Sequence, residues 1–470
     1  MRSLSAHILA GVALIATALS AAQAQMIAPL PIPPAGTNTQ PQPVTIPIQD
    51  FVGPPVMGSV AAESTDSIQC LAFPTTLQLA MSHSPERNLA LAERQIAKAR
   101  MKQEQGTGLP SLAAYARAAD GDTGLVDGRT NTQTGLIASQ RLFDFGQGHF
   151  RMKAAREKSR AALFSIIDAT TQARVNAGES YLDILEGRER LAAAKRRQSR
   201  FMELSDGVDR RLEAGLITKA TASSILAEAA SAAAQKVEVE LALETAEIEI
   251  SLLTGSRQLP CDDSSHVAQT LDIPPIVMGT SFDSLNAALA VPEVKAAIAM
   301  REAALADLET SRRVQRPVIS IEGVGAYQYD QLMKRWDLAK KVGIDVQMPL
   351  FSGGSYGGER DEARARAASS AGEIQRLTRN YRRQLEQGIQ RIHSFGEVAT
   401  AREAAVAAQR AEVTAVREQF ERGLRPYQDY ERAEADLAQS ETTSISARYA
   451  ALRERLQVLA LLGLLPSGNP

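Results

Sequence analysis

One short stretch of the sequence has the residue spacing of a hydrolase nucleophile. Gly353-Gly-Ser355-Tyr-Gly357 matches the pattern G-x-S-x-G, in which a serine lies on the sharp turn between a strand and a helix. Such a serine needs a nearby histidine as its general base. The histidine downstream of it, His393, lies on the same predicted helix, about 57 Å away at a rise of about 1.5 Å per residue. We therefore predict no catalytic residue and no enzymatic activity.

The sequence also lacks the patterns of metal, phosphate and nucleic-acid sites. No two histidines are four residues apart, as a pair of helical metal ligands would be. The glycines at 353 and 354 are not followed by the Lys-Ser or Lys-Thr of a phosphate-binding loop. The formal net charge is -2, so no basic field favours nucleic acid. We expect no metal, no cofactor and no nucleic-acid partner.

The first 24 residues predict export. Arg2 precedes an apolar stretch from about Ile8 to Leu19, and Ala22-Gln-Ala24 is a small-x-small cleavage site, as in a secretory signal peptide. The segment 25–68 is rich in proline, threonine and glutamine, which predicts an extended or disordered chain. Beyond the signal no apolar run reaches the length of about 18 residues that a spanning helix needs. A crossing of the membrane would therefore have to use strands.

Cys70 and Cys261 are the two cysteines of the chain. In an oxidising compartment an even pair of cysteines is typical of a disulfide. The alternative is two free thiols that never meet. We predict a Cys70–Cys261 disulfide that closes a large loop and contributes about 3 kcal/mol to stability.

The rest of the chain is a duplication with an offset of about 208 residues. The stretch RLFDFGQG at 141–148 corresponds to MPLFSGGS at 348–355, and Pro110 corresponds to Pro317. Gly215-Leu216 likewise corresponds to Gly423-Leu424. A period this long indicates a duplicated domain and not a solenoid. We divide the chain into a signal peptide (1–24), a proline-rich segment (25–68), repeat one (69–255), an insert (256–281), repeat two (282–466) and a tail (467–470).

Each repeat predicts the same order of elements. A leading helix is broken near Pro85 in repeat one and near Pro292 in repeat two. Two segments of period-two alternation then predict strands, and a polar loop joins them. Trp336 falls in the second of these loops, as an interfacial aromatic would. The predicted ranges are helices at 75–105 and 281–313, strands at 111–119, 134–142, 317–329 and 341–348, and loops at 120–131 and 330–340.

A long helix and a return helix complete each repeat. No proline interrupts 147–212 or 355–422. A glycine stops each long helix, Gly215 in the first and Gly423 in the second, and an apolar seam continues in the helix that returns. Four strands per chain cannot close a barrel in lipid, because about eight is the practical minimum. If the strands cross a membrane, the chain must form oligomers, and three copies would supply twelve strands.

These residues resemble the TolC-like family of outer-membrane channels of efflux and type I secretion. The resemblance covers about 75–465 and rests on the repeat, the Leu-Phe-x-x-Gly turns, and the tip turns RRLEAGLITKATASSILAEAASA and EQFERGLRPYQDYERAEADLAQS. It implies a mainly α fold with a transmembrane β-barrel, in which a homotrimer forms a 12-stranded barrel and a periplasmic α-helical tunnel. The protein would be a passive conduit in the outer membrane, in contact with its lipid. Its partners would be a periplasmic adaptor and an inner-membrane transporter.

The resemblance also implies roles for individual residues. The adaptor or pump would dock at the two tip turns, and the pore gate would lie beside the second one. Two family positions differ here, since Thr221 and Arg432 stand where acidic residues are expected. An Arg-to-Asp bridge between the repeats would therefore be absent or rebuilt. The implied residues are Phe420, Arg425 and Asp429 for the gate, Gly215, Leu216, Gly423 and Leu424 for the tip turns, and Leu142, Phe143, Gly146, Leu350, Phe351, Gly353 and Gly354 for the strand-to-helix turns.

The same family fold would place Cys70 and Cys261 together at the middle of the tunnel. An exported coiled-coil scaffold or adaptor without channel activity is the alternative function, because such proteins also contain long alanine-rich helices. It would not require two pairs of alternating segments, each joined to a helix by Leu-Phe-x-x-Gly. The sequence therefore favours the channel.

Overall fold

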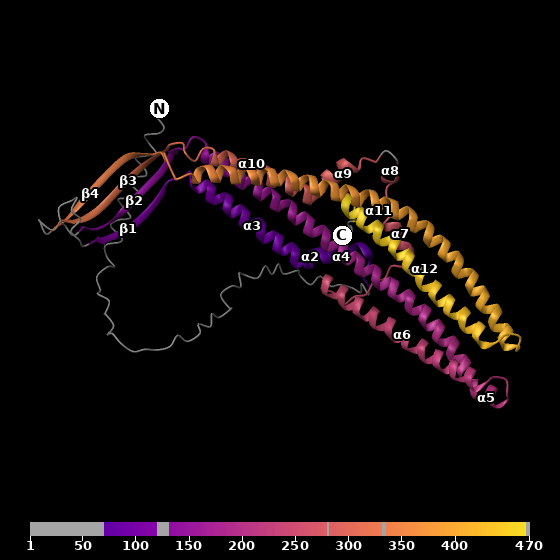
Figure 1. Ribbon diagram of the computed structural model, residues 1–470. Coiled ribbons are helices and arrows are strands. Elements are labelled where there is room, and N and C mark those ends of the chain that lie inside the picture. Colours follow the sequence, from indigo (N-terminus) through magenta and orange to yellow (C-terminus); the bar gives the residue numbers. More distant parts are fainter. Residues whose placement is uncertain (1–69, 120–130, 280–281, 331–334, 467–470) are drawn as a thin grey trace, which may run out of the picture. The chain divides into compact units, whose positions relative to one another are not determined.

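Figure 1 presents the computed structural model of the protein, which describes residues 70–119, 131–279, 282–330 and 335–466. These residues belong to one compact unit, 67–470. The predicted signal peptide, the proline-rich segment and the tail 467–470 lie outside the described residues, as does most of the predicted loop 120–131. None of the helices in the described part is long and apolar enough to span a membrane.

Four strands form one antiparallel sheet in the order β1-β2-β3-β4. Its two central strands come from different repeats, because Ile137 of β2 pairs with Val324 of β3. The outer strands β1 and β4 each have one neighbour, so both edges of the sheet are open. The strand bounds are β1 Ser111–Ala119, β2 Asn131–Phe143, β3 Val318–Asp330 and β4 Arg335–Gln347.

β4 begins earlier than the sequence predicts, and this corrects the place of Trp336. The alternation indicates a strand from Lys341 and a loop at 330–340, whereas the strand starts at Arg335. Trp336 is therefore a strand residue, paired with Tyr329 of β3. Two adjacent lysines, Lys340 and Lys341, interrupt the alternation in the sequence. Backbone pairing with β3 continues through them, so the strand is longer than its pattern suggests.

The register of the sheet separates an apolar face from a polar face. Leu112 of β1 pairs with Ala138 of β2, which pairs with Gly323 of β3, which pairs with Val342 of β4. Residues two positions along a strand point to the same side. Apolar side chains on the face of Val342 are Leu112, Leu136, Ile319, Ile321, Tyr327, Leu338, Ile344 and Val346. The opposite face carries Arg141, Glu322, Lys341 and Asp345, together with apolar residues such as Ile137 and Val324. Lys340 is the one charged residue on the face of Val342 among the described side chains.

In both repeats the chain leaves the sheet through a glycine turn into a very long helix. α4 (Gln147–Ser205) has 59 residues and α11 (Ser355–Glu421) has 67. Gly146 and Gly354 precede them with φ of +86° and +92°, a conformation that glycine adopts without the clash that a Cβ would cause. α4 ends earlier than the predicted 212, because the chain breaks at Asp206 and Gly207 before the short α5 (Val208–Glu213).

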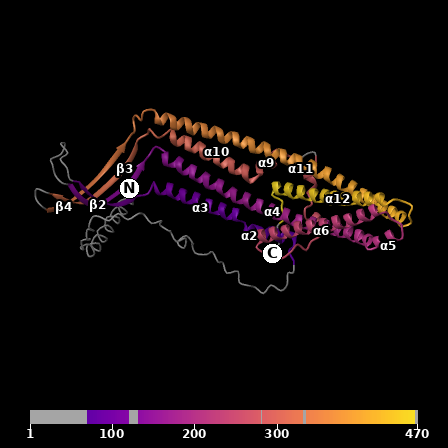
Figure 2. The same ribbon diagram turned by 60° about the horizontal axis from the view of Figure 1, so that its bottom comes forward.

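Each long helix forms a hairpin with a return helix. Hairpin one pairs α4 with α6 (Lys219–Thr254), and hairpin two pairs α11 with α12 (Tyr427–Leu462). Because α12 also packs on α4, the order across this half of the unit is α6-α4-α12-α11. In the half beside the sheet, α3 (Pro85–Gly106) and α10 (Pro292–Ser311) give the order α3-α4-α10-α11. Figure 2 shows these helices running side by side.

Short helices connect the two repeats and start repeat one. The breaks predicted near Pro85 and Pro292 occur, since α2 ends at His83 and α9 ends at Ala290, each just before a proline-started helix. Their bounds are α2 Phe73–His83, α7 Ser264–Thr270, α8 Pro275–Met278 and α9 Ser284–Ala290.

Two apolar clusters hold the hairpins together. The cluster at the middle of the helices joins α2 and α4 to the end of α12, with Phe73, Tyr181 and Leu456 fully buried. The second cluster lies toward the hairpin turns and includes Phe201, Ile225 and Tyr430, which are also fully buried. Both clusters contain residues from both repeats, whereas a smaller third cluster, Val291, Val294 and Leu377, belongs to repeat two alone.

Candidate gate and docking site at the hairpin turns

The two hairpin turns have the same backbone geometry. Gly215 and Gly423 have φ of +69° and +72°. In each turn the following leucine N–H donates to a carbonyl five residues earlier, Leu216 to Arg211 at 2.9 Å and Leu424 to Gln419 at 2.8 Å. This is the glycine C-cap that ends a helix in the left-handed conformation. It leaves the leucine side chains 75% and 71% exposed, so each chain presents two apolar groups on matching turns.

Arg425 and Asp429 form an ion pair within hairpin two. The Arg425 Nη1 lies 3.7 Å from the Asp429 Oδ2, and the two side chains are 48% and 44% exposed. An exposed pair of this kind contributes about 0.5 kcal/mol. The pair joins two residues four positions apart at the start of α12, so it does not hold the two hairpins together.

Phe420, which the resemblance implies for the gate, packs against other side chains of the same chain. Its ring is half-buried and packs against Tyr427 and Tyr430, with centroid distances of 5.8 and 6.1 Å. The guanidinium of Arg211, from hairpin one, lies 5.9 Å from the ring. Burial of an aromatic ring is more favourable than its exposure to water. Within the chain, Phe420 therefore packs between the two hairpins.

Thr221 and Arg432 do not bridge the repeats. The Thr221 N–H donates to the Thr218 side chain at 3.1 Å, which caps the start of α6. Arg432 is exposed and has no ion pair with any residue in the described part of the chain. A bridge at these two family positions is therefore absent from the structure.

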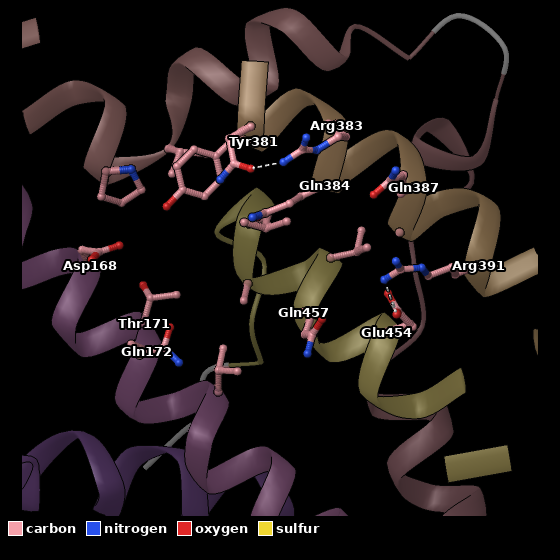
Figure 3. A pocket seen from close by; sticks show the side chains of 18 of the residues that line it. Asp168, Thr171, Gln172, Tyr381, Arg383, Gln384, Gln387, Arg391, Glu454 and Gln457 are labelled. Carbon is pink, nitrogen blue, oxygen red and sulfur yellow. Dashed lines mark hydrogen bonds and ion pairs between the residues drawn. The ribbon is translucent and has the colours of Figure 1, made fainter. Parts of the chain in front are cut away.

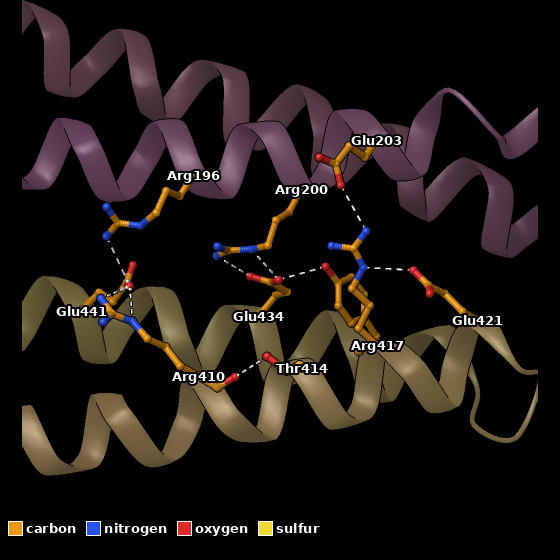
Figure 4. A network of polar contacts seen from close by, with 10 residues as sticks. Arg196, Arg200, Glu203, Arg410, Thr414, Arg417, Glu421, Glu434 and Glu441 are labelled. Carbon is orange, nitrogen blue, oxygen red and sulfur yellow. Dashed lines mark hydrogen bonds and ion pairs between the residues drawn. The ribbon is translucent and has the colours of Figure 1, made fainter.

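Buried ion pairs further along the helices connect the hairpins instead. Glu434 of α12 is fully buried, and its carboxylate contacts Arg200 of α4, with Nε–Oε1 and Nη2–Oε2 distances of 2.6 and 2.8 Å. The Tyr430 hydroxyl donates to the same carboxylate at 2.8 Å. Burial, followed by the charge of Glu434, raises the pKa of Tyr430, so this hydroxyl keeps its proton. Figure 4 shows the arginines of α4 directed at α12.

Glu441 makes a second buried connection, one that involves three helices. It is 4% exposed, and its Oε1 lies 3.3 Å from Arg196 of α4 and 2.7 Å from Arg410 of α11. Burying these carboxylates is costly unless they are paired, so each one needs its arginines. Sequence reasoning did not find these residues. The sequence contains a weak signal for them. Glu434 and Glu441 are seven residues apart, and Arg196 and Arg200 are four apart, so each pair lies on one face of its helix.

At the sheet end, the apolar residues of the strand-to-helix turns are exposed. Leu142 and Phe143 are 52% and 54% exposed, and Leu350 and Phe351 are 77% and 87% exposed. In repeat one, Asp144 accepts hydrogen bonds from the N–H groups of Gly146 and Gly148 at 3.1 and 2.7 Å and thereby holds the bend. In repeat two, Gly353 and Gly354 both have positive φ. Ser355 and His393 lie on the same helix, α11, and are far apart along it. His393 therefore cannot act as the general base for the serine of the G-x-S-x-G motif.

Cys70 and Cys261 are neighbours but are not bonded. The backbone places them together, since the Leu71 N–H donates to Leu259 and the Cys261 N–H donates to Leu71, at 2.9 and 3.1 Å. Burial, followed by contact with Cys70, raises the pKa of the Cys261 thiol to about 11. Both cysteines are free in the structure. The predicted proximity is therefore present and the predicted bond is not, so the bond stays a prediction.

A polar groove of about 550 Å³ lies where α12 ends and α10 begins, between α4 and α11. Figure 3 shows its side chains, among them Asp168, Tyr381 and the ion pair Arg391–Glu454, whose atoms are 3.0 Å apart. Burial, followed by the nearby charge of Glu293, raises the pKa of Asp168.

Across the described residues, no group of three His, Cys, Asp or Glu side chains could hold a metal ion.

Comparisons with known proteins agree with this architecture. The family model described as outer membrane efflux protein matches residues 76–256 and 286–464. The solved structure of CusC is similar, with a TM-score of 0.71 and 18% identity over 83% of this chain and 91% of that one. The CmeC channel of Campylobacter jejuni has a TM-score of 0.72 and 15% identity over 85% and 87%. VceC of Vibrio cholerae has a TM-score of 0.69 and 19% identity over 83% and 96%. No curated protein sequence matches the chain significantly.

Proposed function

Because the chain belongs to the outer membrane efflux protein family, we propose that three copies of it assemble into one passive conduit through the outer membrane. The barrel would be made of twelve strands and the tunnel of the long hairpins. The conduit would work with a periplasmic adaptor and an inner-membrane transporter, in efflux or in type I secretion.

The observation that carries this proposal is the two-faced sheet with two open edges. The face of Val342 is apolar apart from Lys340 and a few uncharged polar residues, and the other face carries charges such as Glu322 and Asp345, which is how barrel strands face lipid and water. Val342, Ile344 and Val346 are 79%, 70% and 61% exposed in the single chain. Open edges are not tolerated in lipid, so β4 of one copy would pair with β1 of the next. A coiled-coil scaffold gives no reason for such a sheet.

The test of this function is the mass and conductance of the purified protein. We expect it to remain in membranes washed with high salt, to have three times the protomer mass in detergent, and to form ion channels in planar bilayers. A detergent-solubilised monomer, or release of the protein by salt alone, would show that the proposal is wrong.

The pore gate would lie at the turn of hairpin two. Three-fold symmetry would bring Asp429 from each copy to one level of the tunnel, where Arg425 offsets part of its charge. The buried pairs of Glu434 and Glu441 would hold hairpin two against hairpin one in the closed state. They would thus replace the bridge that Thr221 and Arg432 cannot make.

The exposed turn leucines, Leu216 and Leu424, would be the contacts for the adaptor. Each is a single apolar group on a rigid glycine turn, which suits insertion into a partner's groove. Three copies with two turns each would present six such contacts at the end of the tunnel.

A disulfide between Cys70 and Cys261 would join the start of repeat one to the insert in the oxidising periplasm. Their neighbouring backbones are already held by hydrogen bonds, so little rearrangement would be required. Titration of the protein purified without reductant and then unfolded should find no free thiol. Two thiols per chain would exclude the bond.

A further inference from the structure

The polar groove between α4 and α11 contains a carboxylate without a partner. Asp168 of α4 lines this groove (Figure 3) and makes no hydrogen bond or ion pair with any residue in the described part of the chain. The other charged side chains that line the groove each have a polar partner. These pairs are Arg391–Glu454 at 3.0 Å, Glu179–Gln457 at 2.9 Å and Arg383–Asn380 at 2.8 Å. Among the described residues, Asp168 is therefore the lining charge that is left for a ligand.

The surroundings of Asp168 disfavour its negative charge. Burial and the nearby charge of Glu293 on α10 raise the pKa of Asp168. Tyr381, whose side chain also lines the groove, donates the hydrogen bond of its hydroxyl to Glu293 and not to Asp168. A cation bound beside Asp168 would supply the missing opposite charge and would favour the ionised carboxylate.

The groove combines this carboxylate with an apolar floor. Val175, Val291 and Val458 line it and are almost fully buried, so they lie at its bottom. Exposed amide side chains, Gln172 and Gln384 among them, lie around its opening. The volume of about 550 Å³ falls within the range of small-molecule pockets, about 300–1,000 Å³. A metal ion would find a single free carboxylate here, whereas a larger ligand could contact the charge and the floor together.

The groove opens on the side of the helices that the insert and the residues after α12 leave bare. On the covered side of α4, Arg174 donates to the Leu465 carbonyl and Arg188 donates to the Pro260 carbonyl, at 3.1 and 2.7 Å. Glu179, which lines the groove, precedes Arg188 by nine residues. At about 100° per residue, these two side chains lie on opposite sides of α4. A conduit needs a clear interior, so in the proposed function the bare side faces the tunnel.

We propose that this groove binds a small organic cation with an apolar body, with the positive group at Asp168 and the apolar part against Val175, Val291 and Val458. The aromatic ring of Tyr381 would add a cation–π contact. All the lining residues belong to one copy, so each chain carries a complete site. The place of the groove in the tunnel rests on the proposed function. Three grooves would surround the tunnel at one level and would give the otherwise passive conduit a preference for cationic cargo.

Binding of ethidium, a planar organic cation, tests the groove. Fluorescence anisotropy with the full-length protein in non-ionic detergent should show saturable binding, and Asp168→Asn should weaken it roughly tenfold or more. Asp168→Glu keeps the charge and should retain most of the affinity. The matched control, Asp436→Asn, removes an exposed carboxylate of α12 outside the groove and should bind as the unchanged protein does. Tetramethylammonium, which has the charge without the apolar body, should displace ethidium only at a far higher concentration.

The outcomes separate the groove from the conduit. Equal ethidium binding by Asp168→Asn and the unchanged protein, or displacement by an equal concentration of tetramethylammonium, would overturn the groove and leave a conducting trimer intact. Weaker binding by Asp168→Asn in a protein that is a monomer without conductance would instead support the groove and overturn the conduit. As a second measurement, ethidium should briefly block single channels in planar bilayers, and Asp168→Asn should shorten these blocks. Blocks of equal length in both channels would contradict the place of the groove in the tunnel.

Discussion

Asp429 and Glu434 are carboxylates of the same helix, and their burial gives them different roles. Asp429 is about half exposed and pairs with Arg425 across one turn. Glu434 is fully buried between hairpins and pairs with Arg200 of the other repeat. In the proposed trimer, the first would act on ions in the tunnel, and the second would act on the position of the hairpins.

We expect Asp429→Ala to change ion selectivity and not stability. In the trimer, three Asp429 carboxylates would form a ring that attracts cations and that a multivalent cation could bind and block. Single-channel recordings of the variant should show lower cation preference and weaker block by trivalent cations, with the trimer intact. Arg425→Ala should instead raise the cation preference, because Arg425 offsets part of the Asp429 charge. Unchanged selectivity and block in Asp429→Ala would show that this residue does not line the constriction.

Glu434→Gln should lower stability, because it removes one partner of a buried ion pair and leaves the Arg200 charge uncompensated. Breaking such pairs costs about 3 kcal/mol. Urea unfolding followed by helical circular dichroism should detect the loss. Asp429→Asn serves as the control on the same helix and should change the free energy of unfolding by no more than about 0.5 kcal/mol. Equal effects of the two substitutions would contradict the difference in burial.

Asp168 makes stability depend on pH. Its folded-state pKa is raised by burial and then by Glu293, so ionisation is less favourable in the folded chain than in the unfolded one. The penalty is absent below the unfolded pKa of about 4, grows as the pH rises through the folded pKa, and is constant above it. Asp168→Asn should therefore raise the thermal midpoint at pH 8 and have little effect near pH 4. Asp436→Asn, at an exposed position of α12, should give no such pH-dependent gain.

At the scale of elements, the glycine turns fix where a strand becomes a helix. Gly354 has φ of +92°, and the next glycine, Gly357, lies inside α11 with open space around it. Gly354→Ala should destabilise the protein by about 1–2 kcal/mol, because a Cβ clashes in the left-handed conformation. Gly357→Ala should stabilise it by about 0.5–1 kcal/mol, since alanine favours the helix. Thermal unfolding of the two variants should move in opposite directions, and a shift of both in one direction would contradict this account.

The sequence predicts the elements well where residues close together in the chain determine them. The glycine ends of the hairpins, the proline breaks and the number of strands follow from neighbouring residues. The sequence predicts a loop around Trp336, because two lysines interrupt the alternation of apolar and polar residues. The strand nevertheless begins before them, and its start is defined by the pairing with β3. The partners Arg200 and Glu434 could not be predicted, because they come from different repeats and meet only when α12 packs on α4.

At the scale of the whole molecule, the duplication gives one chain two equivalent hairpins and two unlike edges. The shared clusters and the Glu434 and Glu441 ion pairs bind hairpin one to hairpin two within the chain. In the proposed trimer, the open edges of the sheet would meet another copy. Each copy would then contribute two turns to the same end of the assembly, and the two turns have the same backbone geometry.

Matching turns predict that adaptor docking depends on both leucines. Leu216→Asp or Leu424→Asp alone should weaken copurification with the cognate adaptor, because half of the six apolar contacts remain. The double variant should abolish it, with trimer mass and single-channel conductance unchanged. Ala220→Asp and Gln428→Asp are the controls, since they add the same charge at exposed first-turn positions of α6 and α12, where an acidic residue suits the helix dipole. If the double variant still binds the adaptor as the controls do, the adaptor contacts another part of the hairpins.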